Sequence, residues 1–312
     1  MKIFFAFLFV PFLAFSQAKK EVVEYNNSIA LPFNTTTNTV LNFNTALLQG
    51  ADPAELIQKR DAVLKSLNSL NQVLSGIKPM SNDYGFYNAT KGGAEIYKMY
   101  FKNNYTNEQL SNIPATARHN IKKIKDAQKA AEKMNTWNKD FSKRQKKLLL
   151  EYKIDLNVDS NMFERTQAHQ AAMNYYYEVA LNELKVQAFV DDFVDAFNAS
   201  EKDKIKASQA SLKSQIILSN KFMNALKPYK NDDSLLKSSD KVLGFYKKLS
   251  LGLIEDVIKF NSFPDNVPND KVDEYNILVD KVNNGVEFLN TLQSYLNESQ
   301  VVINKFFQTH LY

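Results

Sequence analysis

Three acidic residues in one segment have the spacing that paired acid–base chemistry or metal binding requires. Asp191 and Asp195 stand four residues apart, and Asp192 and Asp195 stand three apart, so a helix would bring them to neighbouring positions. Two carboxylates placed in this way can hold a divalent metal and assist hydrolysis. A solvated face answered by lysines such as Lys202 and Lys204 is the simpler interpretation. We therefore assign no metal site and no catalytic residue here, and keep a metal-assisted hydrolase as the third hypothesis.

The other residue types that commonly carry chemistry are too scattered to form a site. The three histidines, His119, His169 and His310, lie on different segments and lack the spacing of a metal motif. The sequence has no cysteine, no serine in a nucleophile motif, and no phosphate or calcium loop. His169 falls within an apolar stripe, which predicts a buried core histidine. We expect a protein that is not an enzyme and uses no cofactor.

A basic segment, residues 118–153, is the strongest signal outside the core pattern. It holds twelve Lys and Arg residues against four Asp and Glu, and several recur at steps of three or four, which places them on one helical face. The candidate interaction surface comprises Arg118, Lys122, Lys125, Lys129, Lys133, Trp137, Lys143, Arg144, Lys146 and Lys147. A cationic face beside Trp137 and Phe141 suits an acidic protein partner or an anionic lipid or lipopolysaccharide surface. A solvated basic face is the plain alternative.

The segment Met80–Gly93 is the least regular part of the chain and offers a second candidate contact region. Its glycines and its turn-forming residues predict a loop. The aromatic residues Tyr84, Phe86 and Tyr87 are the candidate loop contacts. They either fold back onto the protein or stay exposed for recognition.

Helical periodicity organises the rest of the chain. Gly and Pro number eight each and mostly stand where the periodicity stops, which predicts an all-α protein. Four apolar stripes joined by short connections predict an elongated bundle of long antiparallel helices from residue 161 onward. The stripes cover residues 161–197, 205–226, 236–260 and 272–307, the last as one helix of about 36 residues.

The region before the bundle, residues 17–160, reads as a more irregular set of helices. Pro32 predicts that the first of them, residues 21–49, is kinked or broken. Asp52 followed by Pro53, and Thr106 followed by Gln109, are start signals for two further helices. We treat 17–160 and 161–312 as two regions, with one continuous domain as the alternative.

Residues 1–16 have the pattern of a secretory signal peptide. Lys2 precedes an apolar core, Ile3–Phe15, and Ala14-Phe15-Ser16 supplies small residues for cleavage. About 13 apolar residues are too few to span a bilayer. An exported chain of this length without cysteine is typical of bacteria. We expect a soluble product in the bacterial periplasm or outside the cell, where nucleic acid is not a partner.

Two segments begin with the same Tyr-Asn pair. Tyr25-Asn26 is followed by Ile29, and Tyr275-Asn276 is followed by Val279 and Asn283. These segments resemble the repeated Tyr-Asn-centred helix starts of the YiiG-like family, a group of exported bacterial helical proteins of unknown function. The resemblance implies helices and export and supplies no activity. Many members of that group look like lipoproteins, whereas this chain lacks the lipidation cysteine.

Two further functional hypotheses rank above the hydrolase. The leading one is a non-enzymatic exported protein that acts as an accessory or interaction subunit of a bacterial cell-envelope assembly, with an envelope protein as its partner. The alternative is a periplasmic protein that binds a small molecule, lipid or glycan in a pocket between helices. Aromatic residues such as Tyr176 and Trp137 would line that pocket.

Overall fold

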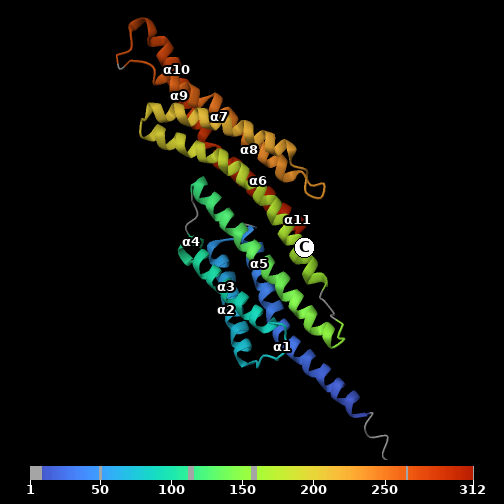
Figure 1. Ribbon diagram of the computed structural model, residues 1–312. Coiled ribbons are helices and arrows are strands. Elements are labelled where there is room, and N and C mark those ends of the chain that lie inside the picture. The colour runs from blue at the N-terminus through green and yellow to red at the C-terminus, as the bar shows by residue number, and fades with distance from the viewer. Residues whose placement is uncertain (1–8, 49–50, 112–115, 156–159, 265, 312) are drawn as a thin grey trace, which may run out of the picture. The chain divides into compact units, whose positions relative to one another are not determined.

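The protein is built from helices. The computed structural model describes residues 9–48, 51–111, 116–155, 160–264 and 266–311. These residues form helices of widely different lengths and no β-strand, which confirms the predicted all-α class (Figure 1). None of the helices in the described part of the chain is long and apolar enough to cross a membrane.

The chain divides into two compact units. Unit 1 comprises Met1–Ile113 and Gln128–Gln167, and unit 2 comprises Pro114–Ala127 and Ala168–Tyr312. Two long helices, α5 (Ala117–Glu151) and α6 (Ser160–Asn198), each contribute residues to both units.

Unit 1 contains α1 to α4 and the later part of α5. The bounds are α1 Phe9–Leu48, α2 Pro53–Gly76, α3 Phe86–Asn104 and α4 Asn107–Ser111. Both predicted start signals are confirmed. Asp52 accepts a hydrogen bond from the N–H of Glu55 at 2.9 Å, and Thr106 and Gln109 exchange side-chain to backbone bonds in a capping box.

The first helix is not broken at Pro32, where the sequence predicted either a kink or a break. α1 runs without interruption through Pro32 to Leu48. The hydroxyls of Thr35, Thr36 and Thr37 each bond to the carbonyl four residues earlier, as threonine side chains in helices often do. Thr36 also lies 2.9 Å from the Ser66 hydroxyl on α2, so packing between α1 and α2 holds a segment that its local sequence disfavours.

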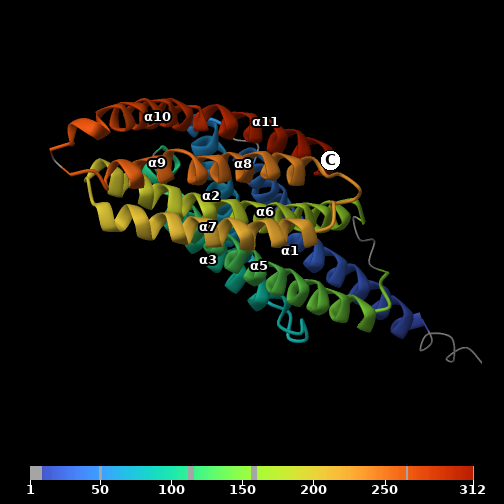
Figure 2. The same cartoon turned by 90° about the horizontal axis from the view of Figure 1, so that it is seen from above.

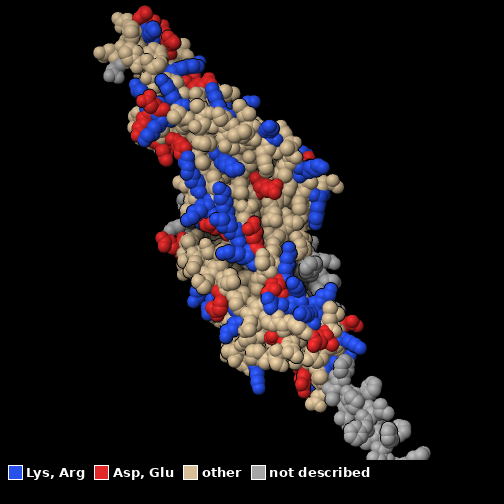
Figure 3. Space-filling view, in the orientation of Figure 1, with Lys and Arg blue, Asp and Glu red and all other residues tan. Residues whose placement is uncertain are grey.

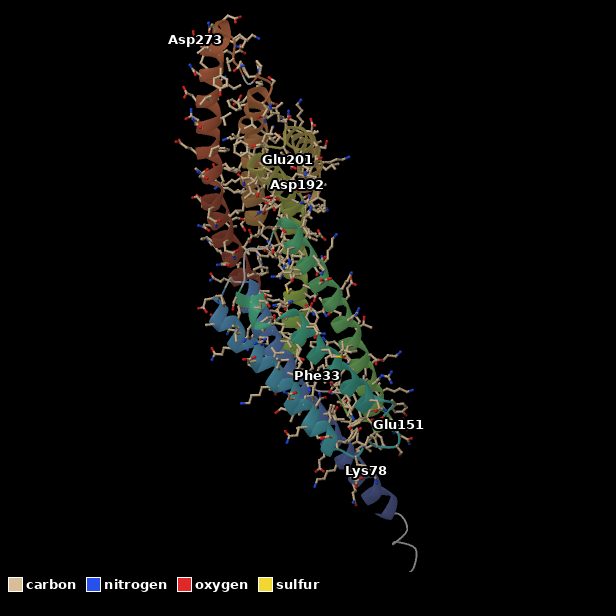
Figure 4. All side chains as sticks on the ribbon, turned by 90° about the vertical axis from the view of Figure 1, so that its left-hand side faces the viewer. Phe33, Lys78, Glu151, Asp192, Glu201 and Asp273 are labelled. Atoms are coloured by element: carbon tan, nitrogen blue, oxygen red, sulfur yellow. The ribbon has the colours of Figure 1, made fainter. Side chains whose placement is uncertain are left out.

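The core of unit 1 is continuous across its helices. α2 buries one face of leucines and valine against α1 and α3, and α5 adds Phe141, Leu148 and Leu149. Phe33 of α1, labelled in Figure 4, stacks on Phe141 with ring centroids 3.8 Å apart. This stacking ties the apolar side of α5 to the first helix of the unit.

The four predicted stripes form α6, α7, α8–α9 and α10–α11, which lie in unit 2 except for the first residues of α6. The bounds are α7 Lys202–Ala225, α8 Ser234–Leu251, α9 Leu253–Phe260, the short 3₁₀ turn Asn269–Lys271, α10 Val272–Asn290 and α11 Leu292–His310. Figure 2 shows α8 and α9 between α7 and the α10–α11 pair. Neighbours in sequence therefore pack as neighbours in space, as the short connections predict.

Two stripes are interrupted where one helix was predicted. The third breaks at Gly252, and the last breaks at Thr291 rather than running as a single helix from 272 to 307. At Thr291 the hydroxyl bonds to the carbonyl of Phe288 at 2.7 Å, and the carbonyl of Thr291 accepts the N–H of Ser294, three residues on. The N–H of Thr291 also bonds to the carbonyl of Phe288, so the backbone bonds at this point span three residues instead of the four of a regular α-helix.

The predicted signal peptide, residues 1–16, lies partly outside the described residues. Residues 9–16 are helical and continue into α1. Cleavage after Ser16 remains a prediction from the sequence.

Candidate functional site

The basic segment folds as one amphipathic helix, α5. Its apolar side is packed into the protein, with Phe141 only 4% exposed and Leu148 fully buried. The opposite side carries exposed lysines, and Figure 3 shows Lys and Arg side chains gathered along this helix. The exposed members of the predicted surface are Arg118, Lys122, Lys125, Lys129, Lys133, Lys143, Lys146 and Lys147.

Trp137, predicted as part of the interaction surface, is held within unit 1. Its indole N–H donates to the carbonyl oxygen of Ala89 at 2.8 Å. Its ring packs against Phe33 and Tyr97, with centroids 5.0 and 4.8 Å away. Gly93 makes this approach possible, because a Cβ at that position would lie 1.7 Å from the indole. The side chain joins α5 to α3 and is not free to enter a lipid surface.

Two basic residues that follow Phe141, Arg144 and Lys147, contact the loop that precedes α3. Arg144 donates from Nη1 to the carbonyl of Tyr84 at 2.7 Å and from Nε to Asp140, also at 2.7 Å. The ammonium group of Lys147 lies 4.2 Å from the centroid of the Tyr84 ring, within range of a cation–π interaction. These two residues therefore have structural contacts within unit 1. In contrast, Lys129, Lys133 and Lys143 form no ion pair with any carboxylate of the described chain.

The three candidate loop contacts are packed down rather than displayed. The loop is shorter than predicted, because α3 begins at Phe86, and both Phe86 and Tyr87 are buried. The carboxylate of Asp83 organises the turn by accepting hydrogen bonds from Gly85 N at 2.8 Å, Tyr87 N at 3.0 Å and the Tyr25 hydroxyl at 2.7 Å. Burial, together with that bond to Asp83, raises the pKa of Tyr25 above its ordinary value.

The acidic group on α6 holds the start of α5. Asp191 accepts the N–H of Ala117 at 2.9 Å, and Arg118 forms a bidentate pair with Asp192 at 2.5 and 2.6 Å. Asp192 is labelled in Figure 4 on α6 beside the first turns of α5. Burial raises the pKa of Asp191, and the bond from Ala117 opposes that shift. An acid at a helix N-terminus stabilises the helix.

The partners of these acids differ from the expected ones. Lys202 instead donates to the carbonyl of Asn261, and Lys204 pairs with Glu201. The residue that forms the ion pair with Asp192 is Arg118, which lies 74 positions away in the sequence. No pattern of nearby residues predicts this pair. Within the described residues, no group of three or more His, Asp or Glu side chains is placed to hold a metal ion.

The histidines remain apart. His119 is exposed on α5 and His169 is buried, the latter as predicted. His310 lies on α11 with Nε2 at 2.9 Å from the Asp232 carboxylate. Burial acts to raise the pKa of Asp232, but hydrogen bonds from Ser234 and His310 outweigh it and hold the pKa below its ordinary value. This pair fastens the end of α11 to the turn before α8.

The two residues predicted to line a ligand pocket belong to different units. Tyr176 lies in unit 2, where its ring meets Phe307 at 5.2 Å, and Trp137 lies in unit 1. Each packs against residues of its own unit. Among the described residues, no contact of Tyr176 or Trp137 favours the small-molecule hypothesis.

Glu183 on α6 was not among the predicted functional residues. It interrupts the apolar stripe of α6, and burial raises the pKa of its carboxyl to about 7, with the Ser239 hydroxyl acting in the opposite direction. Burial, and to a smaller extent the nearby charge of Glu183, raise the pKa of Tyr176 to about 12. The interruption of the stripe was the only signal that an acid points into this bundle.

No protein-family model matches the chain, and neither a curated protein nor a solved structure matches it. The resemblance to the YiiG-like family therefore stays a prediction from two short motifs.

Proposed function

We propose that this protein is an exported accessory or interaction subunit of a bacterial cell-envelope assembly, and that it binds an acidic protein partner through the exposed basic face of α5. The observation that carries the proposal is a row of exposed lysines in unit 1, Lys129, Lys133 and Lys143, that form no ion pair with a carboxylate within the described residues. A row of unpaired positive charges attracts a surface of negative charge and speeds the encounter of the two proteins.

The position of the aromatic side chains favours a protein partner over a lipid surface. Helices that lie on membranes bury an apolar face among the acyl chains, and the charges alone add only about 1 kcal/mol per residue. Here Phe141 is buried and the Trp137 N–H is bound to Ala89. What α5 presents outward is mainly positive charge, with Leu150 as an exposed apolar side chain near its end, which suits an electrostatic contact with an acidic protein.

A charge-reversal experiment tests the proposal. Lys129, Lys133 and Lys143, all exposed in unit 1, are changed together to Glu in the mature chain. The matched control reverses three exposed lysines elsewhere in the same unit, Lys65, Lys78 and Lys102, so that the net charge is identical. Both proteins are cross-linked in envelope extracts at low and at high salt, and captured proteins are identified by mass spectrometry.

The expected result is an acidic envelope protein that is captured by the wild type and by the control, lost with the α5 variant, and weakened by salt. Equal capture by both variants would refute the assignment of the face. Binding to vesicles of anionic lipid with no protein captured would show the lipid alternative instead. The expected export is checked separately by fractionation and by sequencing the mature N-terminus, which should begin at Gln17.

A further inference from the structure

The exposed side of α7 carries an apolar cluster that nothing in the described chain covers. Ile217 is 69% exposed, Leu218 60% and Phe222 40%, all within six residues. The opposite side of α7 is in the core, where Ile205, Leu212 and Ile216 are buried. Contiguous exposed apolar surface of this kind usually marks a site of association.

The outward residues of α7 form a regular seam. They follow the alternating steps of four and three that keep residues on one helix face, and all of them are exposed. In order they are Asp203, Ala207, Ala210, Ser214, Ile217 and Lys221. The seam has small residues in its first half, a bulky residue in its second half, an acid at one end and a base at the other. Neither charged end forms an ion pair within the described residues.

We propose that α7 is a self-association surface, which packs antiparallel against α7 of a second copy of this chain about a two-fold axis at the level of residue 212. In this arrangement Asp203 meets Lys221 of the second copy, Ala207 meets Ile217, and Ala210 meets Ser214. Symmetry repeats each contact, as a two-fold interface requires. Every layer then joins an acid to a base, a bulky residue to a small one, or two small residues.

The order of residues along the seam selects this orientation. A parallel pair would place Lys221 against Lys221 and Asp203 against Asp203, and like charges in contact are repulsive. It would also stack Ile217 on Ile217 and leave the alanines facing alanines across a gap. In the antiparallel pair Ile217 fills the space above Ala207, and the small central residues let the two helices approach closely.

The size of the seam sets the expected strength. From Asp203 to Lys221 the helix rises about 27 Å at 1.5 Å per residue, and a helix face is about 10 Å wide. Such a footprint falls below the area of a standard stable interface. We therefore expect a weak dimer with a dissociation constant in the micromolar range or above. This surface uses none of the lysines of α5, so the self-association proposal can be tested independently of the proposed acidic partner.

Cysteine cross-linking tests the orientation directly, because the chain contains no cysteine of its own. The variants Ala207→Cys and Ile217→Cys are made in the mature chain, oxidised separately, and then oxidised as a mixture. Two copies of residue 207 lie about 15 Å apart along an antiparallel pair, too far for a disulfide, whereas residues 207 and 217 of different copies are opposite each other. The expected result is a cross-linked dimer only in the mixture. Cross-linking of each variant with itself would overturn the antiparallel arrangement, and no cross-linking in any sample would overturn the proposal.

Sedimentation velocity over a range of protein concentrations tests the surface without cysteines. Ile217→Asp should abolish association, whereas Ile277→Asp on α10, where the isoleucine is 57% exposed, should leave it unchanged. Asp203→Lys and Lys221→Asp should each weaken the dimer about tenfold, and the double exchange should restore most of the affinity. A wild-type chain that stays monomeric at millimolar concentration, or a control that is as defective as Ile217→Asp, would refute the assignment.

Discussion

The change of Glu183 to Gln should make unit 2 more stable at neutral pH. The carboxyl of Glu183 is half-buried on α6, and its pKa rises from its ordinary value of 4.5 to about 7 because burial disfavours the charge. In a window from about pH 4.5 to pH 7, the folded protein keeps a proton that the unfolded chain has lost. Stability therefore falls as the pH rises through this window, and the cost is complete above about pH 7.

The size of the effect follows from the shift. A pKa difference of one unit corresponds to about 1.4 kcal/mol, so a rise from 4.5 to about 7 gives at most about 3 kcal/mol. Some solvent contact remains at Glu183, which screens the charge and reduces the cost. We expect Glu183→Gln to raise the free energy of unfolding by about 1 to 3 kcal/mol at pH 8 and by little at pH 5.

Urea denaturation at several pH values measures the effect. The single tryptophan, Trp137, lies in unit 1, so its fluorescence reports that unit, and far-UV circular dichroism is needed to follow unit 2. Glu178→Gln is the matched control, because Glu178 is exposed on the same helix. If Glu183→Gln loses as much stability between pH 5 and pH 8 as the wild type does, the buried carboxyl is not the source of the pH dependence and the reasoning fails.

Three further predictions follow from contacts in the two units. Gly93→Ala should destabilise unit 1 by about 1 to 3 kcal/mol because the added Cβ meets the Trp137 ring, whereas Gly92→Ala, with nothing within 4 Å, should stabilise it by about 0.5 to 1 kcal/mol. Urea titrations followed by tryptophan fluorescence compare the pair, and equal effects would contradict the packing. Asp83→Ala should lower the unfolding free energy by roughly 2 to 4 kcal/mol in the same assay, since three donors lose their acceptor. Asp232→Asn should lower the melting temperature at neutral pH and make the melting temperature depend less on acid. The ionised Asp232 of the wild type stabilises the fold above its ordinary pKa, and this stabilisation disappears as the pH falls through the lowered pKa of the folded protein. If the melting temperature of the variant falls under acid as much as that of the wild type, the contact with His310 is not the cause of the acid sensitivity.

The sequence was a good guide to helices and a poor guide to what faces outward. Periodicity placed all four long stripes, and the cap signals at Asp52 and Thr106 placed two helix starts, because both depend on residues a few positions apart. It predicted a kink or a break at Pro32, where packing between α1 and α2 accompanies a helix without a break. It also predicted one helix where α10 and α11 are separated at Thr291, because the backbone bonds there span three residues instead of four.

The candidate surface divided in a way that only contacts over long sequence distances reveal. Lys129, Lys133 and Lys143 are exposed as the periodicity predicts. Trp137 and Arg144 were grouped with them by proximity in sequence, yet they bind Ala89 and Tyr84, which lie 48 and 60 residues away. Helical periodicity predicts which residues share a face of a helix, but it does not predict which of them are covered by a neighbouring helix.

The amino-acid sequence by itself determined the helical class, the positions of the long helices and the concentration of positive charge on α5, because each is written in the order of nearby residues. The tertiary structure alone decided that Asp191 and Asp192 hold the start of α5, that Glu183 is drawn into a bundle, and that the apolar cluster at Ile217 stays uncovered. These are matters of which surfaces meet. Which helix faces pack together depends on the fold of the whole chain, so the pattern of residues within one segment does not predict it.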